Sequence, residues 1–163
     1  MKRRYGNQAG RVLAIALVAT TLAARGGTAP ADYRDLERQV ARQVNDYRGG
    51  KRLGKLVYDE RVAAIARVHS VDMASGREKL GHTGFKDRAA AVNRMTPYDA
   101  IAENVALNDY SRPRTVAVAV QGWLHSPHHL ENIAGDYDHT GVGVARSADG
   151  TFYYTQLFVS RRR

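Results

Sequence analysis

The chain has 163 residues and a formal net charge of +9, and it contains no cysteine. The lack of cysteine excludes disulfide bonds, thiol catalysis and cysteine-ligated zinc. The sequence lacks the dense stripe of Lys and Arg that nucleic-acid binding requires, so we expect no nucleic-acid partner.

Residues 1–31 have the pattern of a secretory signal peptide. Basic residues precede an apolar run over residues 12–24, and residues 29–31 (APA) form a small-residue cleavage site. The run is shorter than the roughly 20 residues that a membrane span needs. A lipoprotein-like box has Arg25 where the lipidated cysteine would stand. We therefore expect cleavage after Ala31, no stable membrane anchor, and a secreted or periplasmic protein.

Removal of this segment takes away five basic residues and no acids, so the formal charge falls from +9 to +4. Part of the remainder is a basic tail at residues 161–163. The chain that is left is long enough for one domain with its own core and too short for two. We place this domain at residues 32–160.

Two amphipathic helices open the domain. In the first helix, apolar residues recur every three or four positions at Leu36, Val40, Val44 and Tyr47. Gly49-Gly50 ends this helix. After an extended piece at residues 56–58, a second helix begins near Asp59. His69 falls on the apolar face of this helix, and we interpret it as a buried, hydrogen-bonded core histidine.

Residues 76–103 show little periodicity, and we expect a loop there. Glycines flank His82, so this imidazole can be presented freely from the loop. Glu103 interrupts a small apolar segment, and a carboxylate in that position needs a partner. The partner is either structural, such as backbone N–H groups or an arginine, or part of a functional site.

The stretch of residues 123–143 gathers four of the six histidines beside the only tryptophan. A helix with Val116, Val120 and Trp123 on its apolar face runs into this stretch and must stop before Pro127. The break between this helix and the next leaves side chains free to face a cleft.

Ser126-Pro127 is typical of the start of a new short helix, with Ser126 as its N-cap and not as a nucleophile. The short helix carries His128, His129 and Asn132. Neighbouring residues on a helix point about 100° apart, so we expect only one of the two histidines to face inward.

Residues 141–145 and 151–159 are rich in β-branched and aromatic residues, and turn residues separate them. They predict an antiparallel hairpin. The order of elements indicates an α+β domain in which helices pack over a small antiparallel sheet.

These motifs together resemble the CAP superfamily, also called SCP, in its bacterial secreted branch. The resemblance rests on pieces that occur in this order: Asn45 and Arg48, residues 66–74, Gly81-His82, residues 102–106, residues 123–133, and the hairpin. It implies an α-β-α sandwich with a cleft lined by two histidines and two acidic residues.

By this resemblance His82 is the first cleft histidine, Glu103 is the cleft glutamate and His129 is the second histidine. Ser126 and Asn132 belong to the same ligand-binding cleft. The second acid has no counterpart, because the family's Trp-x-x-Glu ends here in Ser126.

The resemblance implies a binding module whose cleft engages an extracellular lipid, glycan or peptide. His82 and His129 are the candidate ligands of a divalent metal such as zinc. The alternative is a metal-assisted hydrolase that acts on cell-envelope material. The missing second acid and the lack of an evident nucleophile favour binding, and the sequence assigns no catalytic residue.

Overall fold

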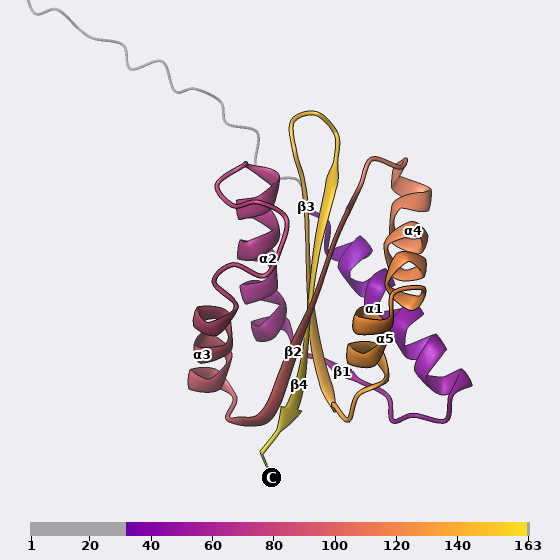
Figure 1. Ribbon diagram of the computed structural model, residues 1–163, viewed down its shortest axis with the longest axis vertical. Helices are drawn as coiled ribbons and strands as arrows, with labels where there is room; N and C mark the ends of the chain where they lie inside the picture. Colours follow the sequence, from indigo (N-terminus) through magenta and orange to yellow (C-terminus); the bar gives the residue numbers. More distant parts are fainter. Residues whose placement is uncertain (1–31, 163) are drawn as a thin grey trace, which may run out of the picture.

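A central sheet separates two layers of helices in the computed structural model, which describes residues 32–162 (Figure 1). Helices α2 and α3 cover one face, and α1, α4 and α5 cover the other. The helices are α1 (Arg34–Gly50), α2 (Glu60–Ala74), α3 (Phe85–Met95), α4 (Arg112–Leu124) and α5 (Pro127–Ala134). This is the expected α-β-α sandwich. The predicted signal peptide lies outside the described residues.

The sheet has the strand order β1-β3-β4-β2. Its strands are β1 (Val57–Tyr58), β2 (Tyr98–Asn108), β3 (His139–Arg146) and β4 (Phe152–Arg161). The β3–β4 hairpin forms the centre, and β2 pairs with β4 in antiparallel fashion. The two-residue β1 pairs with β3 in parallel, so the sheet is antiparallel except at this edge.

Helices α1, α2 and α4 form where the apolar spacing predicts them. In α1, Leu36, Val40 and Val44 are buried at intervals of four. Helix α2 begins after Asp59, whose side chain accepts a hydrogen bond from the backbone N–H of Arg61. No helix in the described part of the chain is long and apolar enough to cross a bilayer.

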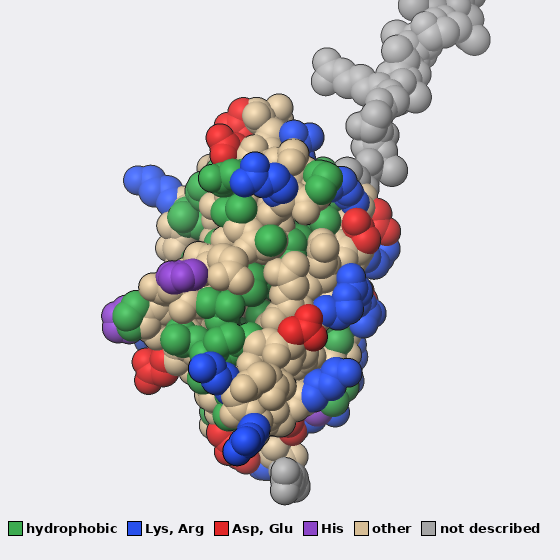
Figure 2. All heavy atoms as spheres, turned by 90° about the vertical axis from the view of Figure 1, so that its right-hand side faces the viewer, with side chains coloured by type: hydrophobic (Ala, Val, Ile, Leu, Met, Phe, Trp, Pro, Cys, Tyr) green, Lys and Arg blue, Asp and Glu red, His purple; other side chains and the backbone are tan. Residues whose placement is uncertain are grey.

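The largest core cluster lies between the sheet and the α1, α4 and α5 layer. Trp123 is 1% exposed and its indole N–H donates to the carbonyl of Val105 at 3.0 Å. Tyr154 and Phe158 of β4 are fully buried in the same cluster. On the outer face of this layer, Lys and Arg side chains stand among acidic and apolar ones and form no dense stripe (Figure 2).

The structure corrects the expectation of a loop over residues 76–103. Helix α3 and the first half of β2 occupy much of this stretch. Only Ala89 and Val92 of α3 are buried, so the helix carries too few apolar positions to show a period. In β2 two consecutive polar residues, Glu103 and Asn104, are both buried, which breaks the apolar–polar alternation by which a strand is recognised.

Two arginines of the predicted basic tail, Arg161 and Arg162, contact acidic side chains of the domain. Arg161 lies within β4, and its guanidinium contacts the carboxylate of Asp59 at 2.7 Å. Arg162 pairs with Asp99 at 3.0 Å. The domain therefore extends at least to Arg162.

Two glycines let α2 approach β3 without intervening side chains. A Cβ on Gly141 would lie 2.2 Å from the backbone N of Ala63, and one on Gly143 would lie 2.2 Å from that of Arg67. The carbonyl of Gly143 accepts a hydrogen bond from Ser70 Oγ at 2.9 Å. Any side chain at either glycine would push the helix away from the strand.

Candidate functional site

Glu103 stands at the centre of the candidate site, and its side chain is 1% exposed. Arg88 of α3 holds both carboxylate oxygens, with Nε 2.7 Å from Oε2 and Nη2 2.8 Å from Oε1. Such bidentate, charge-assisted pairs are strong and fix geometry. The third nitrogen, Nη1, donates to the carbonyl of Thr83 at 2.7 Å. Arg88 therefore ties β2, α3 and the preceding loop together.

His82 reaches the same carboxylate from that loop. Gly84 closes the loop at a φ of 73°, a conformation that favours glycine. His82 Nδ1 lies 2.9 Å from Glu103 Oε1. Opposite a carboxylate, Nδ1 carries the proton of the neutral ring, so Nε2 is left as an acceptor. The His82 side chain is 53% exposed, which makes Nε2 available to a ligand.

His69 approaches Glu103 from α2, inside the protein. It is 2% exposed, as expected for a core histidine, and Nδ1 lies 3.1 Å from Thr155 Oγ1. The same nitrogen is 3.7 Å from Glu103 Oε2. On the other side of the ring, Nε2 lies 3.3 Å from Glu78 Oε2 without hydrogen-bond alignment. The ring thus packs behind the carboxylate and supports it.

His129 enters from the N-terminal part of α5 and is half-buried, whereas His128 is exposed, as the helix geometry predicts. The Nδ1 atom of His129 is buried and has no hydrogen-bond partner among the described residues. Burial lowers the pKa of His129, and the charges of His82 and His128 lower it further. His82 is therefore near enough for its charge to act on His129, and a cleft shared by the two rings stays a prediction.

Asn132 holds α5 against β2. Its amide donates to the carbonyl of Glu103 at 3.2 Å and to Asn104 Oδ1 at 2.9 Å. Asn104 in turn donates to the carbonyl of His129 at 3.0 Å. Asn132, which we predicted to bind ligand, therefore uses its amide to position the helix that carries His129.

Ser126 occupies the N-cap position of α5 as predicted, but its side chain makes no capping hydrogen bond. Its backbone carbonyl accepts from Leu130 N at 2.8 Å. No hydrogen bond in the described part of the chain joins the Ser126 hydroxyl to a histidine or to Glu103. The structure thus gives Ser126 no base that would activate it as a nucleophile.

Sequence reasoning missed Arg88, although one signal pointed to it. A carboxylate in an apolar segment requires a partner, and an arginine was one of the open alternatives for Glu103. Arg88 lies 15 positions before Glu103, in a helix with no clear apolar period, so nothing in the sequence selected it from the other arginines.

The same contacts limit metal binding. Within residues 32–162 no group of three or more His, Asp or Glu side chains lies where it would hold a metal ion. Arg88 occupies both oxygens of Glu103, which leaves the imidazoles of His82 and His129 as donors. A catalytic zinc site normally has three protein ligands. The residues therefore do not complete such a site.

Histidine ionisation should make folding stability depend on pH. Burial lowers the pKa of both His69 and His129 below the ordinary value of 6.5, and for His69 the charge of Arg88 adds to the effect. Below about pH 6.5 the unfolded chain therefore binds protons that the folded chain does not. The free energy of unfolding is highest above this pH and decreases as the pH falls toward the lower pKa values of the two histidines in the folded chain.

We expect the melting temperature to fall between pH 7.5 and pH 5.0, before carboxylates protonate. Calorimetry of wild type and His129→Gln checks this, since the variant should lose less stability over that interval. The exposed neighbour offers a matched control, because His128→Gln removes only a minor charge contribution to the pKa of His129 and should change the slope far less than His129→Gln. Identical pH profiles for wild type and His129→Gln would contradict the assignment.

Comparisons with known proteins agree with this architecture. The family model "CAP: Cysteine-rich secretory protein family" matches residues 41–158. An uncharacterised membrane protein of Bacillus subtilis is 34% identical over 132 residues, which are 77% of this chain and 34% of that protein. The chain thus spans about a third of the length of this relative.

Solved structures share the fold at lower identity. An outer surface protein of Borrelia burgdorferi has a TM-score of 0.70 at 19% identity, over 82% of this chain and 98% of that one. An extracellular SCP-domain protein of Bacillus anthracis has a TM-score of 0.60 at 24% identity, over 78% and 41% of the two chains. At these identities the likeness shows the shared fold alone. Although it contains no cysteine, the chain belongs to the cysteine-rich secretory protein, or CAP, family.

Proposed function

We propose that the protein is an extracytoplasmic binding module whose cleft engages a ligand between His82 and His129. The observation that supports this most is the buried, unpartnered Nδ1 of His129. A buried polar atom without a partner costs free energy, and a ligand hydroxyl or amide would remove that cost once a small movement of α5 uncovers the atom. The exposed ring of His82 supplies a second polar contact. Such chemistry suits a glycan, a peptide or a lipid headgroup.

Hydrolysis is the alternative, and the contacts of Glu103 count against it. A general base must be free to accept a proton from water or substrate. Both oxygens of Glu103 already accept from Arg88, and one lies against His82. The carboxylate therefore orients His82 and does not serve as a base.

A divalent ion remains a proposed ligand of this cleft. Two neutral imidazole nitrogens bind zinc at about 2.0 to 2.1 Å, with water or substrate in the other positions. Protons compete for the same nitrogens, so zinc affinity should fall as the pH decreases.

Zinc titration calorimetry from pH 5.5 to 7.5 tests the two histidines. We expect His82→Ala and His129→Ala each to reduce zinc affinity at least tenfold. The controls are His128→Ala, an exposed position on the same helix, and His139→Ala, whose ring pairs with Asp138 at 2.9 Å. Equal affinity in all five proteins would show that the cleft binds no metal.

Ligand binding and turnover can then be separated. NMR titration with chitotriose, a short-chain phosphatidylglycerol and a tripeptide should shift the His129 ring resonances for at least one probe. Labelled lipid, peptide and peptidoglycan, each with and without zinc, should show no turnover. Turnover that disappears in His82→Ala would overturn the binding proposal in favour of hydrolysis.

A further inference from the structure

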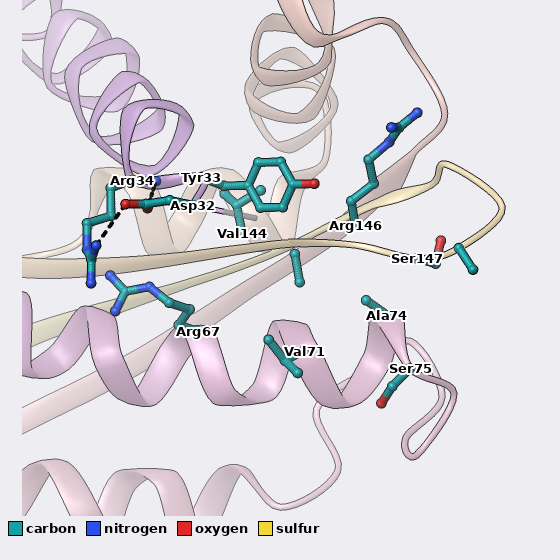
Figure 3. Close-up of a pocket in the computed structure, with 12 residues that line it drawn as sticks. Asp32, Tyr33, Arg34, Arg67, Val71, Ala74, Ser75, Val144, Arg146 and Ser147 are labelled. Atoms are coloured by element: carbon teal, nitrogen blue, oxygen red, sulfur yellow. Dashed lines mark hydrogen bonds and ion pairs between the residues drawn. The ribbon is translucent and has the colours of Figure 1, made fainter. Parts of the chain in front are cut away.

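A large hollow lies away from His82 and His129, along the outer edge of β3. This β3-edge groove has a volume of about 680 Å³. Figure 3 views it with α1 above and α2 below the strand. Its walls comprise residues 32–34, residues 144–148, Arg67, Val71, Ala74 and Ser75.

The groove exists because β1 is too short to cover β3. Strand β1 pairs only with His139 and Thr140, and the chain then turns into α2. In the hairpin, Ser147 N donates to the carbonyl of Thr151, so every second residue of β3 faces β4. By this alternation the backbone N–H and C=O groups of Val144 and Arg146 point to the open edge.

Side chains cap part of this edge. Tyr58 Oη donates to the carbonyl of Val142, and Glu37 Oε1 accepts from Val144 N, both at 3.3 Å. Further along, the carbonyl of Val144 and the backbone groups of Arg146 have no strand beside them in the described structure. An edge of this kind can pair with an added strand.

The groove also offers apolar side chains on both sides. Val71 is 41% exposed, and in Figure 3 it rises with Ala74 from α2 toward the strand. Tyr33 closes the opposite side, and its ring contacts Phe152 edge-on at a centroid distance of 5.7 Å. Side chains of a peptide that alternate in direction would meet these two walls in turn.

The arginines of the groove differ in their pairing. Arg34 contacts Asp32, and Arg67 contacts Glu37 and Glu60, so their charges are balanced.

Arg146 makes no ion pair with an acidic side chain among the described residues. Its Nε donates to the carbonyl of Gly150 at 2.9 Å, and its guanidinium lies 5.1 Å from the centre of the Phe152 ring. Neither contact neutralises its charge, so the open end of the groove is cationic.

We propose that the β3-edge groove docks an extended acidic segment of a protein partner, which pairs with β3 and places a carboxylate against Arg146. The leader segment does not fit as the occupant, since residues 1–31 hold five basic residues and no acid. A fatty acid would satisfy Arg146 but not the free backbone groups of β3. This docking surface is independent of the histidine cleft.

The proposal can be tested with a capped hexapeptide that alternates valine and glutamate. Fluorescence anisotropy gives its affinity for the exported protein, and amide NMR shifts give its place. We expect shifts at Val144 and Arg146 and at least tenfold weaker binding to Arg146→Glu. Ala74→Trp, which fills the groove and keeps its charge, should weaken binding equally. Arg94→Glu makes the same charge change at an exposed position on α3 and should stay within twofold of wild type.

Other results would contradict the docking proposal. Binding that survives either groove substitution, or equal affinity for a peptide in which lysine replaces glutamate, would overturn the proposal. Decanoate that shifts the same amides while the glutamate peptide does not would show that the groove takes an amphiphile instead. Melting curves of the three variants confirm that each protein is folded during the measurement.

Discussion

Arg88→Met should lower the free energy of unfolding by about 3 to 5 kcal/mol, because it leaves the carboxylate of Glu103 buried without its counter-charge. Glu103 accepts both of its short ionic hydrogen bonds from this one guanidinium. The loop that carries His82 should loosen as well, since Arg88 also binds the carbonyl of Thr83. Urea unfolding at pH 7.5 measures the change in stability.

The double variant Arg88→Met, Glu103→Gln provides the control. Removal of the orphaned charge should recover much of the lost stability, because a neutral amide costs far less to bury than a carboxylate. The affinity of the cleft for zinc or ligand should be lower in the double variant than in wild type, since His82 no longer faces an anion. A double variant as unstable as the single one would show that Arg88 stabilises by packing alone.

Arg48→Met should have an effect of similar size for a different reason. Arg48 is 2% exposed, and its guanidinium donates to four backbone carbonyls: those of Gly54, Ile133, Gly135 and Tyr137. Methionine fills the space but leaves these acceptors without donors. We expect a loss of about 3 kcal/mol or more, with the largest changes in the turn between α5 and β3.

Urea unfolding and amide hydrogen exchange measure this effect. Arg42→Met is the matched control, because Arg42 is exposed on the same helix and its loss should cost less than about 0.5 kcal/mol. Equal stability of the two variants would show that water replaces the guanidinium at the carbonyls of the turn.

Elements with a strong local pattern were predictable from the sequence. Helix α1 buries Leu36, Val40 and Val44 on one stripe, and the β3–β4 hairpin has β-branched strands around a polar turn. In these segments local preference and tertiary burial agree, so spacing alone identifies them.

Helix α3 and strand β2 were not predictable in this way. Helix α3 buries only two alanine- or valine-sized side chains, and β2 carries a buried carboxylate and a buried amide side by side. Glu103 and Asn104 are stable there because Arg88 and Asn132 reach them from elsewhere in the chain. Such long-range compensation leaves no periodic trace in the sequence.

The sequence predicted only part of the candidate site, because the contacts that complete it also come from distant parts of the chain. Resemblance selected His82 and Glu103, and the structure brings them within 2.9 Å. It also selected Asn132 and Ser126, whose described contacts are those of helix placement. Residue identity alone cannot separate an amide that faces a ligand from one that docks a helix, because both roles require the same donor.

The paired glycines of β3 have a consequence for motion. Because Gly141 and Gly143 let the main chains of α2 and β3 touch, no layer of side chains separates the helix from the strand at these two positions. We expect α2, and with it the buried His69, to move with the sheet as one unit. If the proposed cleft binds ligands of different size, we expect the glycine-flanked loop that carries His82 and helix α5 to supply the movement.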